Sequence, residues 1–193
     1  MLLGTSAYAQ FSIGAGYVNG KYTYATSSSN SKSSDAANGF YVGAEYLLPV
    51  GNVFGISAGL NYEMLMSKDY NLFGSITGNL KEQYLNLPVR LNFGAEVGDS
   101  RIFAFAGPTL SYALSSKATV GAGGFTGVVD LYEKDILDNR FDVMVGGGLG
   151  IDLMERIRVS VGYDFGMFNK LDDDDEAGTL RRNRLHAGIA FIF

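Results

Sequence analysis

The chain of 193 residues contains no cysteine and no tryptophan, and it has only three prolines and one histidine. Without cysteine, neither a disulfide framework nor a cysteine-based metal site can form. No stretch approaches the roughly 18 uninterrupted apolar residues of a membrane-spanning helix, and the mean hydropathy is only +0.08. These absences exclude a helical membrane protein. They leave open a membrane β-barrel, because its strands expose only every second residue to lipid.

Positive charge is also scarce, since the net charge is -5 and the isoelectric point is about 4.8. This balance argues against a nucleic-acid partner, because such proteins need a basic surface. What the chain has in abundance is glycine, phenylalanine and tyrosine, with 26, 13 and 12 copies. Aromatic residues favour strands, whereas glycine weakens helices. The composition therefore predicts an all-β protein, and the length favours a single domain.

Residues 1–9 end in Ala7-Tyr8-Ala9, which fits the small-x-small cleavage pattern of a secretory signal. Leu2-Leu3 is typical of the end of its apolar region, although a basic first region is missing. We interpret residues 1–9 as the remnant of a signal peptide and residues 10–193 as one barrel domain. The alternative is a short stretch of disordered terminal residues.

From Gln10 onward the dominant hydrophobic period is two, which is typical of strands. Ile157, Val159 and Val161, for example, alternate with Arg158 and Ser160. One face of each segment is apolar and aromatic, while the opposite face holds glycine and charge. The two faces of residues 101–114 are left unassigned. The eight predicted strands cover residues 11–17, 39–48, 54–64, 85–93, 101–114, 141–152, 157–167 and 184–193.

Short and long connections alternate strictly along the chain, as in outer-membrane barrels with short periplasmic turns and long extracellular loops. The sequence therefore predicts an eight-stranded antiparallel up-and-down transmembrane β-barrel of a Gram-negative outer membrane, with both termini in the periplasm. A soluble sandwich is the alternative, but it would not show this regularity. The expected turns are 49–52, 96–100 and 154–156, and the expected loops lie near 25–38, 67–80, 115–139 and 169–181.

Charged residues occur on the inward faces, where an eight-stranded barrel has room only for its own side chains. Charges in such a space must be paired. We therefore expect a structural network that plugs the lumen, and no catalytic residue, cofactor or metal site. Its members are Glu45, Glu63, Arg90, Asp142, Asp152, Arg158, Asp164, Arg184 and His186.

The positions of these residues suggest partners. Asp152 and Arg158 lie symmetrically about residue 155, which makes them cross-strand neighbours. Similar depth predicts further contacts between Glu45 and Arg90, and between Asp164 and both Arg184 and His186.

A catalytic pair of His186 and Asp164 is the functional alternative. Acyl transfer needs a nucleophile beside the base, and Ser160 is the nearby lumenal serine. Ser160 is expected roughly 13 Å deeper than Asp164 along the strand, so we favour a structural histidine.

The predicted loops suggest three further features. Residues 121–132 could extend strands above the membrane. The acidic run 172–176 could bind a divalent cation, but it lacks the spacing of a defined calcium loop, which favours a solvated tip. Nearby arginines could balance that charge or contact lipopolysaccharide phosphates, namely Arg181, Arg182 and Arg184.

The last residue, Phe193, ends the final strand on its apolar face. A terminal aromatic residue at this place resembles the signal by which barrel-assembly machinery selects its clients. The alternative is an ordinary hydrophobic terminus.

The chain contains the motifs Tyr84-Leu-Asn-Leu-Pro-Val-Arg-Leu, Phe105-Ala-Gly-Pro-Thr-Leu-Ser-Tyr, Phe141-Asp-Val, Gly146-Gly-Gly-Leu-Gly and Val161-Gly-Tyr-Asp-Phe-Gly. Together they resemble the PorT-like outer-membrane β-barrel family of Bacteroidetes. Their order and spacing cover nearly all of the chain after residue 9. The resemblance implies an outer-membrane location and an eight-stranded barrel, but it implies little about activity, because family members have different roles and some are linked to protein secretion.

Two functional classes follow from this prediction. In the first, a non-enzymatic barrel uses its extracellular loops for binding or envelope structure. In the second, the barrel is an accessory subunit of a larger outer-membrane complex. A lipid-modifying enzyme is third. The expected partners are outer-membrane lipid and lipopolysaccharide, and the barrel-assembly machinery during biogenesis.

Overall fold

The computed structural model describes residues 9–25, 32–72, 76–122, 125–130, 140–168 and 179–193. Among them, no helix is long and apolar enough to cross a membrane. The regular elements of these residues are the strands β1 (Gln10–Ala25), β2 (Lys32–Val50), β3 (Phe54–Leu72), β4 (Ile76–Val97), β5 (Ser100–Ala122), β6 (Phe125–Asp130), β7 (Phe141–Leu153), β8 (Ile157–Gly166) and β9 (Thr179–Ile192).

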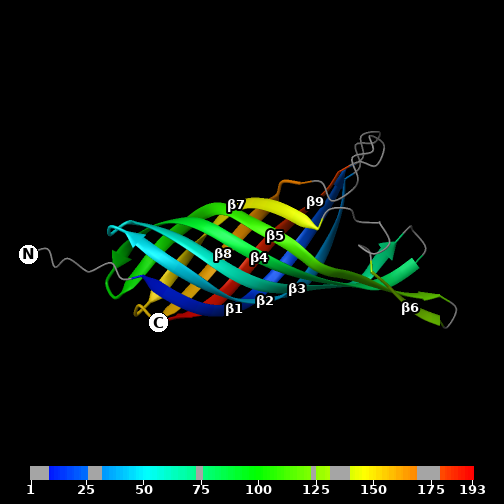
Figure 1. The fold of residues 1–193 in the computed structure, drawn as a ribbon, viewed down its shortest axis with the longest axis horizontal. Helices are drawn as coiled ribbons and strands as arrows, with labels where there is room; N and C mark the ends of the chain where they lie inside the picture. Colours follow the sequence, from blue (N-terminus) through cyan, green and yellow to red (C-terminus); the bar gives the residue numbers. More distant parts are fainter. Residues whose placement is uncertain (1–8, 26–31, 73–75, 123–124, 131–139, 169–178) are drawn as a thin grey trace, which may run out of the picture.

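Eight of these strands form a closed barrel, and all of their pairings are antiparallel. Each barrel strand pairs with the next in the chain, and β1 pairs with β9 from Ser12–Ile192 to Ala25–Thr179. Figure 1 shows the strands running obliquely around a cylinder, with β6 projecting from one end. The predicted eight-stranded up-and-down barrel is therefore confirmed, and β6 is an addition that pairs with β5 outside the barrel.

The pairing register fixes the tilt of the strands. Closing eight strands into a barrel requires a stagger of the register, which is linked to strand tilt and diameter. The stagger can be measured by starting at Lys81 of β4 and stepping around the barrel, each time to the paired residue on the next strand. The path returns to β4 at Leu91, ten residues further along, after passing Met66, Asn38, Asn19, Leu185, Tyr163, Gly147 and Ala106. This stagger gives a tilt of roughly 40° and a narrow interior.

At one end of the barrel, tight turns connect the strands, as predicted. The turns at 51–53 and 98–99 contain Gly51 and Gly98, whose φ angles are 76° and 63°. In the turn after β7, Met154 and Glu155 adopt φ angles of 51° and 57°. Such conformations are rare for residues with a side chain, and here they let the Arg156 amide donate to the Leu153 carbonyl at 3.0 Å.

At the opposite end, strands continue into all four expected loops; such an extension was expected only within residues 121–132, where β5 ends at Ala122 and β6 spans Phe125–Asp130. The pairing of β1 with β2 extends to Ala25 and Lys32, inside the expected loop 25–38. The expected loop 67–80 contains the ends of β3 and β4, and 115–139 contains the end of β5 and all of β6. The last expected loop, 169–181, contains the start of β9. Backbone pairing continues there without the apolar alternation that marked the predicted strands. We call these extended ends of β1 to β5 the raised wall.

Side chains alternate across the barrel wall as expected. Val159 and Val161 of β8 are outward and exposed, whereas Arg158 is buried inside. The structure also assigns the faces of β5, which the sequence left open. Phe103 and Thr109 are buried in the lumen, while Ile102, Leu110 and Tyr112 are exposed on the outer wall.

Glycines in the lumen make room for three aromatic rings. A Cβ at Gly150 would lie within 3 Å of the Phe103 ring, and one at Gly188 would meet the Tyr41 hydroxyl. A Cβ at Gly148 or at Gly162 would likewise lie within 3 Å of the Phe105 ring. Much of the lumenal glycine is therefore explained by the lack of space in a narrow barrel.

A side chain at Gly148 should destabilise the barrel. Its Cβ would lie 2.6 Å from the Gly162 Cα and closer still to the Val161 carbonyl oxygen. We expect Gly148→Val to lower the free energy of unfolding by about 1–3 kcal/mol through overpacking. Urea titration in detergent, followed by far-UV circular dichroism, measures the change.

Ala104→Val is the matched control, because Ala104 faces outward on β5. Its urea midpoint should stay close to that of the parent. Equal midpoints for Gly148→Val and the parent would contradict the crowded lumen.

Candidate functional site: a charge-filled lumen

Five charged side chains form one continuous chain across the middle of the lumen. Arg182 Nη1 lies 2.9 Å from Glu63 Oε1, and Arg184 Nη1 lies 3.1 Å from Glu63 Oε2. Arg184 Nη2 then contacts Asp164 Oδ2 at 2.6 Å, and Arg90 Nη2 contacts Asp164 Oδ1 at 2.7 Å. All five are at most 5 % exposed. Each carboxylate bridges two guanidinium groups, which is the pairing that buried charge requires.

Glu82 lies next to this chain on the side of the long hairpins. It is buried and accepts hydrogen bonds from the hydroxyls of Tyr22, Tyr84 and Ser116. The guanidinium carbon of Arg182 lies 3.6 Å from the centroid of the Tyr84 ring, a cation–π contact. Three arginines therefore share this part of the lumen with three carboxyl groups.

A layer of apolar side chains is packed in the same region. Val18, Leu65 and Ala37 are at most 2 % exposed, and they form a cluster with Tyr22 and Tyr84. The charged chain is thus joined to a hydrophobic layer toward the raised wall. Together they fill this half of the lumen with protein atoms.

A second charged cluster lies toward the tight turns. Arg158 donates to both carboxylate oxygens of Asp152, at 2.7 and 3.0 Å, and to Glu45 Oε1 at 2.7 Å. Arg101 Nη1 approaches Asp152 Oδ2 at 3.8 Å. The guanidinium of Arg158 lies 4.9 Å from the centroid of the Phe103 ring. Two arginines and two carboxylates thus form a balanced group.

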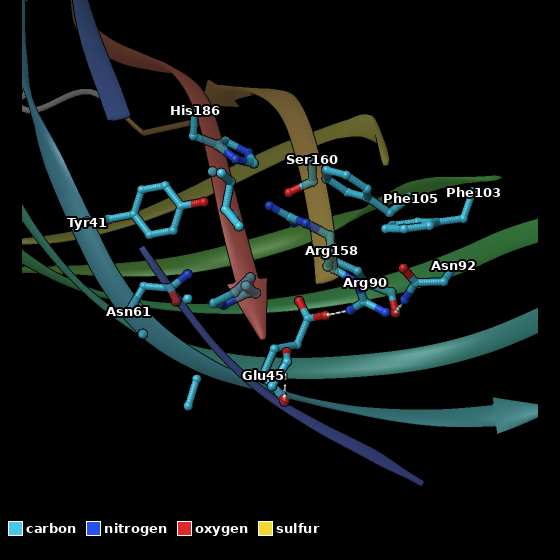
Figure 2. Close-up of a pocket in the computed structure, with 18 of the residues that line it drawn as sticks. Tyr41, Glu45, Asn61, Arg90, Asn92, Phe103, Phe105, Arg158, Ser160 and His186 are labelled. Atoms are coloured by element: carbon cyan, nitrogen blue, oxygen red, sulfur yellow. Dashed lines mark hydrogen bonds and ion pairs between the residues drawn. The ribbon is translucent and has the colours of Figure 1, made fainter. Parts of the chain in front are cut away.

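A cavity of about 100 Å³ separates the two charged clusters. Figure 2 shows Tyr41, Phe105 and His186 around it, with Glu45 and Arg158 on the other side. Its size fits a few water molecules. Side chains surround this pocket between the two clusters, and a second, wider pocket opens at the tight-turn end, where Gln10, Leu47 and Ile192 line it.

The structure places the predicted lumenal residues inside the barrel but changes some contacts. Arg158 lies beside Asp152, and Arg184 beside Asp164, as the positions suggested. The predicted contact of Glu45 with Arg90 is wrong. Glu45 binds Arg158, while Arg90 binds Asp164.

Asp142, the remaining predicted member, is buried in the lumen opposite Ser111 of β5. One of its oxygens accepts a hydrogen bond from the Phe168 amide at 3.5 Å.

Sequence reasoning missed several members of the network. Arg182 was expected near the last loop, in contact with acidic residues or lipopolysaccharide, but it is fully buried and binds Glu63. It occupies the position two residues before Arg184, so the period of two would have placed it inside if the strand had been extended. The other missed residues are Tyr22, Glu82, Tyr84 and Arg101.

The possible catalytic group is only partly assembled. His186 Nε2 lies 3.5 Å from Asp164 Oδ2, but Asp164 also binds Arg90 and Arg184. Ser160 lies opposite Gly188, two residues from His186 along β9, and lines the same cavity. Ser160 is therefore offset from His186 by two residues along the strand direction, whereas its offset from Asp164 is four residues. Among the described residues, no hydrogen bond joins Ser160 to His186.

Within the described part of the chain, no group of three or more histidine, aspartate or glutamate residues could hold a metal ion. The acidic run 172–176, considered above as a cation site, lies outside the described residues.

The outer wall and the closed sheet are those of a membrane barrel, and a comparison with protein families gives the same answer. The outer membrane protein beta-barrel domain family matches residues 1–193. The chain belongs to this family. It is therefore an outer-membrane β-barrel protein of the Gram-negative type, as its alternating strands predicted. The family match does not reach the finer PorT-like group.

Solved structures of outer-membrane barrels share the fold at low identity. Ail of Yersinia pestis, solved with the heparin analogue sucrose octasulfate, is 14 % identical, with a TM-score of 0.52 over 96 % of this chain and 99 % of Ail. OprG of Pseudomonas aeruginosa is 9 % identical, with a TM-score of 0.49 and 97 % of both chains covered. The outer membrane enzyme PagL is 10 % identical, with a TM-score of 0.49 over 91 % of this chain and 98 % of that one.

The likeness to Ail concerns the fold alone. No curated protein matches the chain. The family membership therefore gives location and architecture, but no specific activity.

Glu63 should be the most sensitive position of the network. Its carboxylate binds Arg182, Arg184 and the Asn86 amide, so Glu63→Ala leaves two buried guanidinium groups short of a partner. We expect a loss of about 3–5 kcal/mol in the free energy of unfolding, read from urea midpoints in detergent.

Glu96→Ala is the control, because Glu96 is exposed at the turn end of β4. It should change the free energy of unfolding by less than about 0.5 kcal/mol. A Glu63→Ala midpoint as high as that of Glu96→Ala would refute the central role of Glu63.

Proposed function

We propose that this barrel is a non-enzymatic surface protein with a plugged lumen, whose extracellular side serves binding or envelope structure. The observation that carries the proposal is the filled lumen. The chain from Arg182 to Arg90 and the apolar layer around Leu65 leave no continuous passage through that half of the barrel. A transport role is thereby disfavoured, and the raised wall becomes the feature available to partners.

The proposal places the tight turns and both termini in the periplasm. It is supported by the family rule that short turns are periplasmic and long connections extracellular. The raised wall of β1 to β5 and the β6 hairpin then project from the cell. Removal of residues 1–9 as a signal peptide, suggested by Ala7-Tyr8-Ala9, belongs to the same proposal, although residues 1–8 lie outside the described part of the chain.

Phe193 is proposed as the assembly signal read by the barrel-assembly machinery. Its side chain is 70 % exposed and its ring lies 6.1 Å from Phe11 and 5.0 Å from Phe191, between centroids. Its amide donates to the Phe11 carbonyl at 2.8 Å. An exposed aromatic group at the strand end is thus presented at the junction of β1 and β9.

Membership of the PorT-like group of Bacteroidetes is part of the proposal as well. It is supported by the resemblance of residues 84–91 and 105–112. These two segments lie next to each other on β4 and β5, where Leu87 pairs with Leu110 and Leu91 with Ala106.

The second candidate is an accessory subunit of a larger outer-membrane complex. The outer wall offers a large apolar surface, on which Leu91, Leu149 and Ile189 are more than 60 % exposed. Lipid covers such a surface equally well, so this candidate ranks second. An enzyme ranks third, because Asp164 is held by two arginines rather than by His186 alone.

Deletion of the projecting hairpin separates the first two candidates. Replacing residues 118–129 by an Asn-Gly turn removes most of β6 and the end of β5, which pair mainly with each other and with β4. We expect the shortened chain to fold, and the tagged full chain to be extracted in gentle detergent without a stoichiometric barrel partner, as measured by quantitative mass spectrometry.

Recovery of the same stoichiometric partner by both the full and the shortened chain would contradict the proposal. It would favour the accessory subunit, because the contact would then involve the lipid-facing wall or the periplasmic turns. An untagged chain serves as the background control.

A further inference from the structure

Outward-facing aromatic residues mark the two membrane interfaces on the barrel wall. Near the tight turns, the ring centroids of Phe54 and Phe93 lie 5.2 Å apart, and those of Phe191 and Phe193 lie 5.0 Å apart. Toward the raised wall, Tyr17, Phe40, Tyr112, Phe141 and Phe165 are each more than 40 % exposed. Such girdles flank the apolar band of outer-membrane barrels, so residues beyond the second ring lie in the headgroup region.

Four basic side chains occupy the positions just beyond this second ring. Lys21 and Arg181 lie four residues beyond Tyr17 and Leu185 on β1 and β9, and all four side chains point outward. At about 3.3 Å per residue along a tilted strand, they lie about 10 Å above the ring. On the other side of the barrel, Lys81 and Lys117 take the equivalent place on β4 and β5. We call Lys21, Lys81, Lys117 and Arg181 the basic belt.

Lys81 and Lys117 are directly paired across β4 and β5, and both are exposed. Like charges directly opposite each other on one face destabilise a sheet. Asp130 of β6 lies opposite Lys117 on its other side, while Met66 of β3 lies opposite Lys81. Of the two residues that flank the lysine pair on the neighbouring strands, Asp130 is acidic and Met66 is not.

The opposite rim of the barrel has the reverse charge. Glu96, Asp99 and Glu155 are exposed at the tight turns, with Arg156 as a cation among them. Although the net charge of the chain is -5, the lysines whose side chains the structure describes lie at one membrane interface, where they would meet the headgroups of the outer leaflet in the proposed orientation.

We propose that the basic belt, and above all the Lys81–Lys117 pair, binds the phosphate groups of lipopolysaccharide. Lysine is a flexible point charge suited to phosphate, and each lysine near an anionic membrane surface contributes about five-fold in affinity. A phosphate placed over the pair removes the repulsion between the two ammonium groups. The inference rests on the proposed orientation, which puts this interface in the outer leaflet.

The test titrates bisphosphorylated lipid A onto the full chain in detergent micelles and measures Kd by native mass spectrometry. We expect the double variant Lys81→Gln with Lys117→Gln to bind about thirty-fold more weakly than the parent. The charge-preserving variant Lys81→Arg with Lys117→Arg should bind as the parent does. Arg156→Gln, on the opposite rim, is the matched control and should leave Kd unchanged.

Two lipid arms identify the ligand. Dephosphorylated lipid A should bind the parent as weakly as bisphosphorylated lipid A binds the double glutamine variant. Phosphatidylglycerol, which carries a single phosphate, should show a much smaller difference between the parent and that variant. An equal loss with phosphatidylglycerol, an equal loss in Arg156→Gln, or an unchanged Kd in the double variant would each overturn the lipopolysaccharide site.

Failure of this site is distinguishable from failure of the proposed barrel. Both lysine variants should keep the far-UV circular dichroism spectrum and the heat-dependent gel mobility of a folded barrel. Weak binding in the arginine variant despite an intact barrel would also count against a phosphate site, because the charge is preserved there.

Discussion

The absence of water in the membrane interior requires every backbone amide and carbonyl to find a partner within the protein. The pairing of β4 with β5, together with that of β1 with β9, meets this requirement by leaving the barrel without an edge. Closure with only eight strands makes the interior narrow. The lumenal glycines, the three aromatic rings and the paired arginines all follow from that lack of space.

Burying charge is costly unless each ion has partners. Here each central carboxylate bridges two arginines, as Glu63 and Asp164 do. Such bridges link β3, β4, β8 and β9 through side chains as well as through the backbone. The network therefore joins opposite walls of the barrel and, together with the apolar layer around Leu65, fills the middle of the lumen. Function is left to the surfaces outside the membrane.

The features that could be predicted from sequence are those set by local geometry. A tight turn at 154–156 fixes the register nearby, so the contact of Asp152 with Arg158 followed from spacing. Contacts across the lumen depend on the stagger of the whole barrel, which no segment reveals, and the expected contact of Glu45 with Arg90 failed for this reason. Arg182 was missed because polar strand ends above the membrane lack the apolar alternation that identified the rest of β9.

A residue-by-residue accessibility scan of β8 tests the central claim, namely that lipid covers one face of every strand while protein fills the other. Single cysteines at positions 157–165, possible without background because the chain has none, would carry spin labels in reconstituted bilayers. We predict that labels at Ile157, Val159 and Val161 collide with dissolved oxygen, whereas those at the positions between them are shielded from both oxygen and a water-soluble nickel chelate. Access of the nickel chelate to the outward positions at mid-strand would contradict the account.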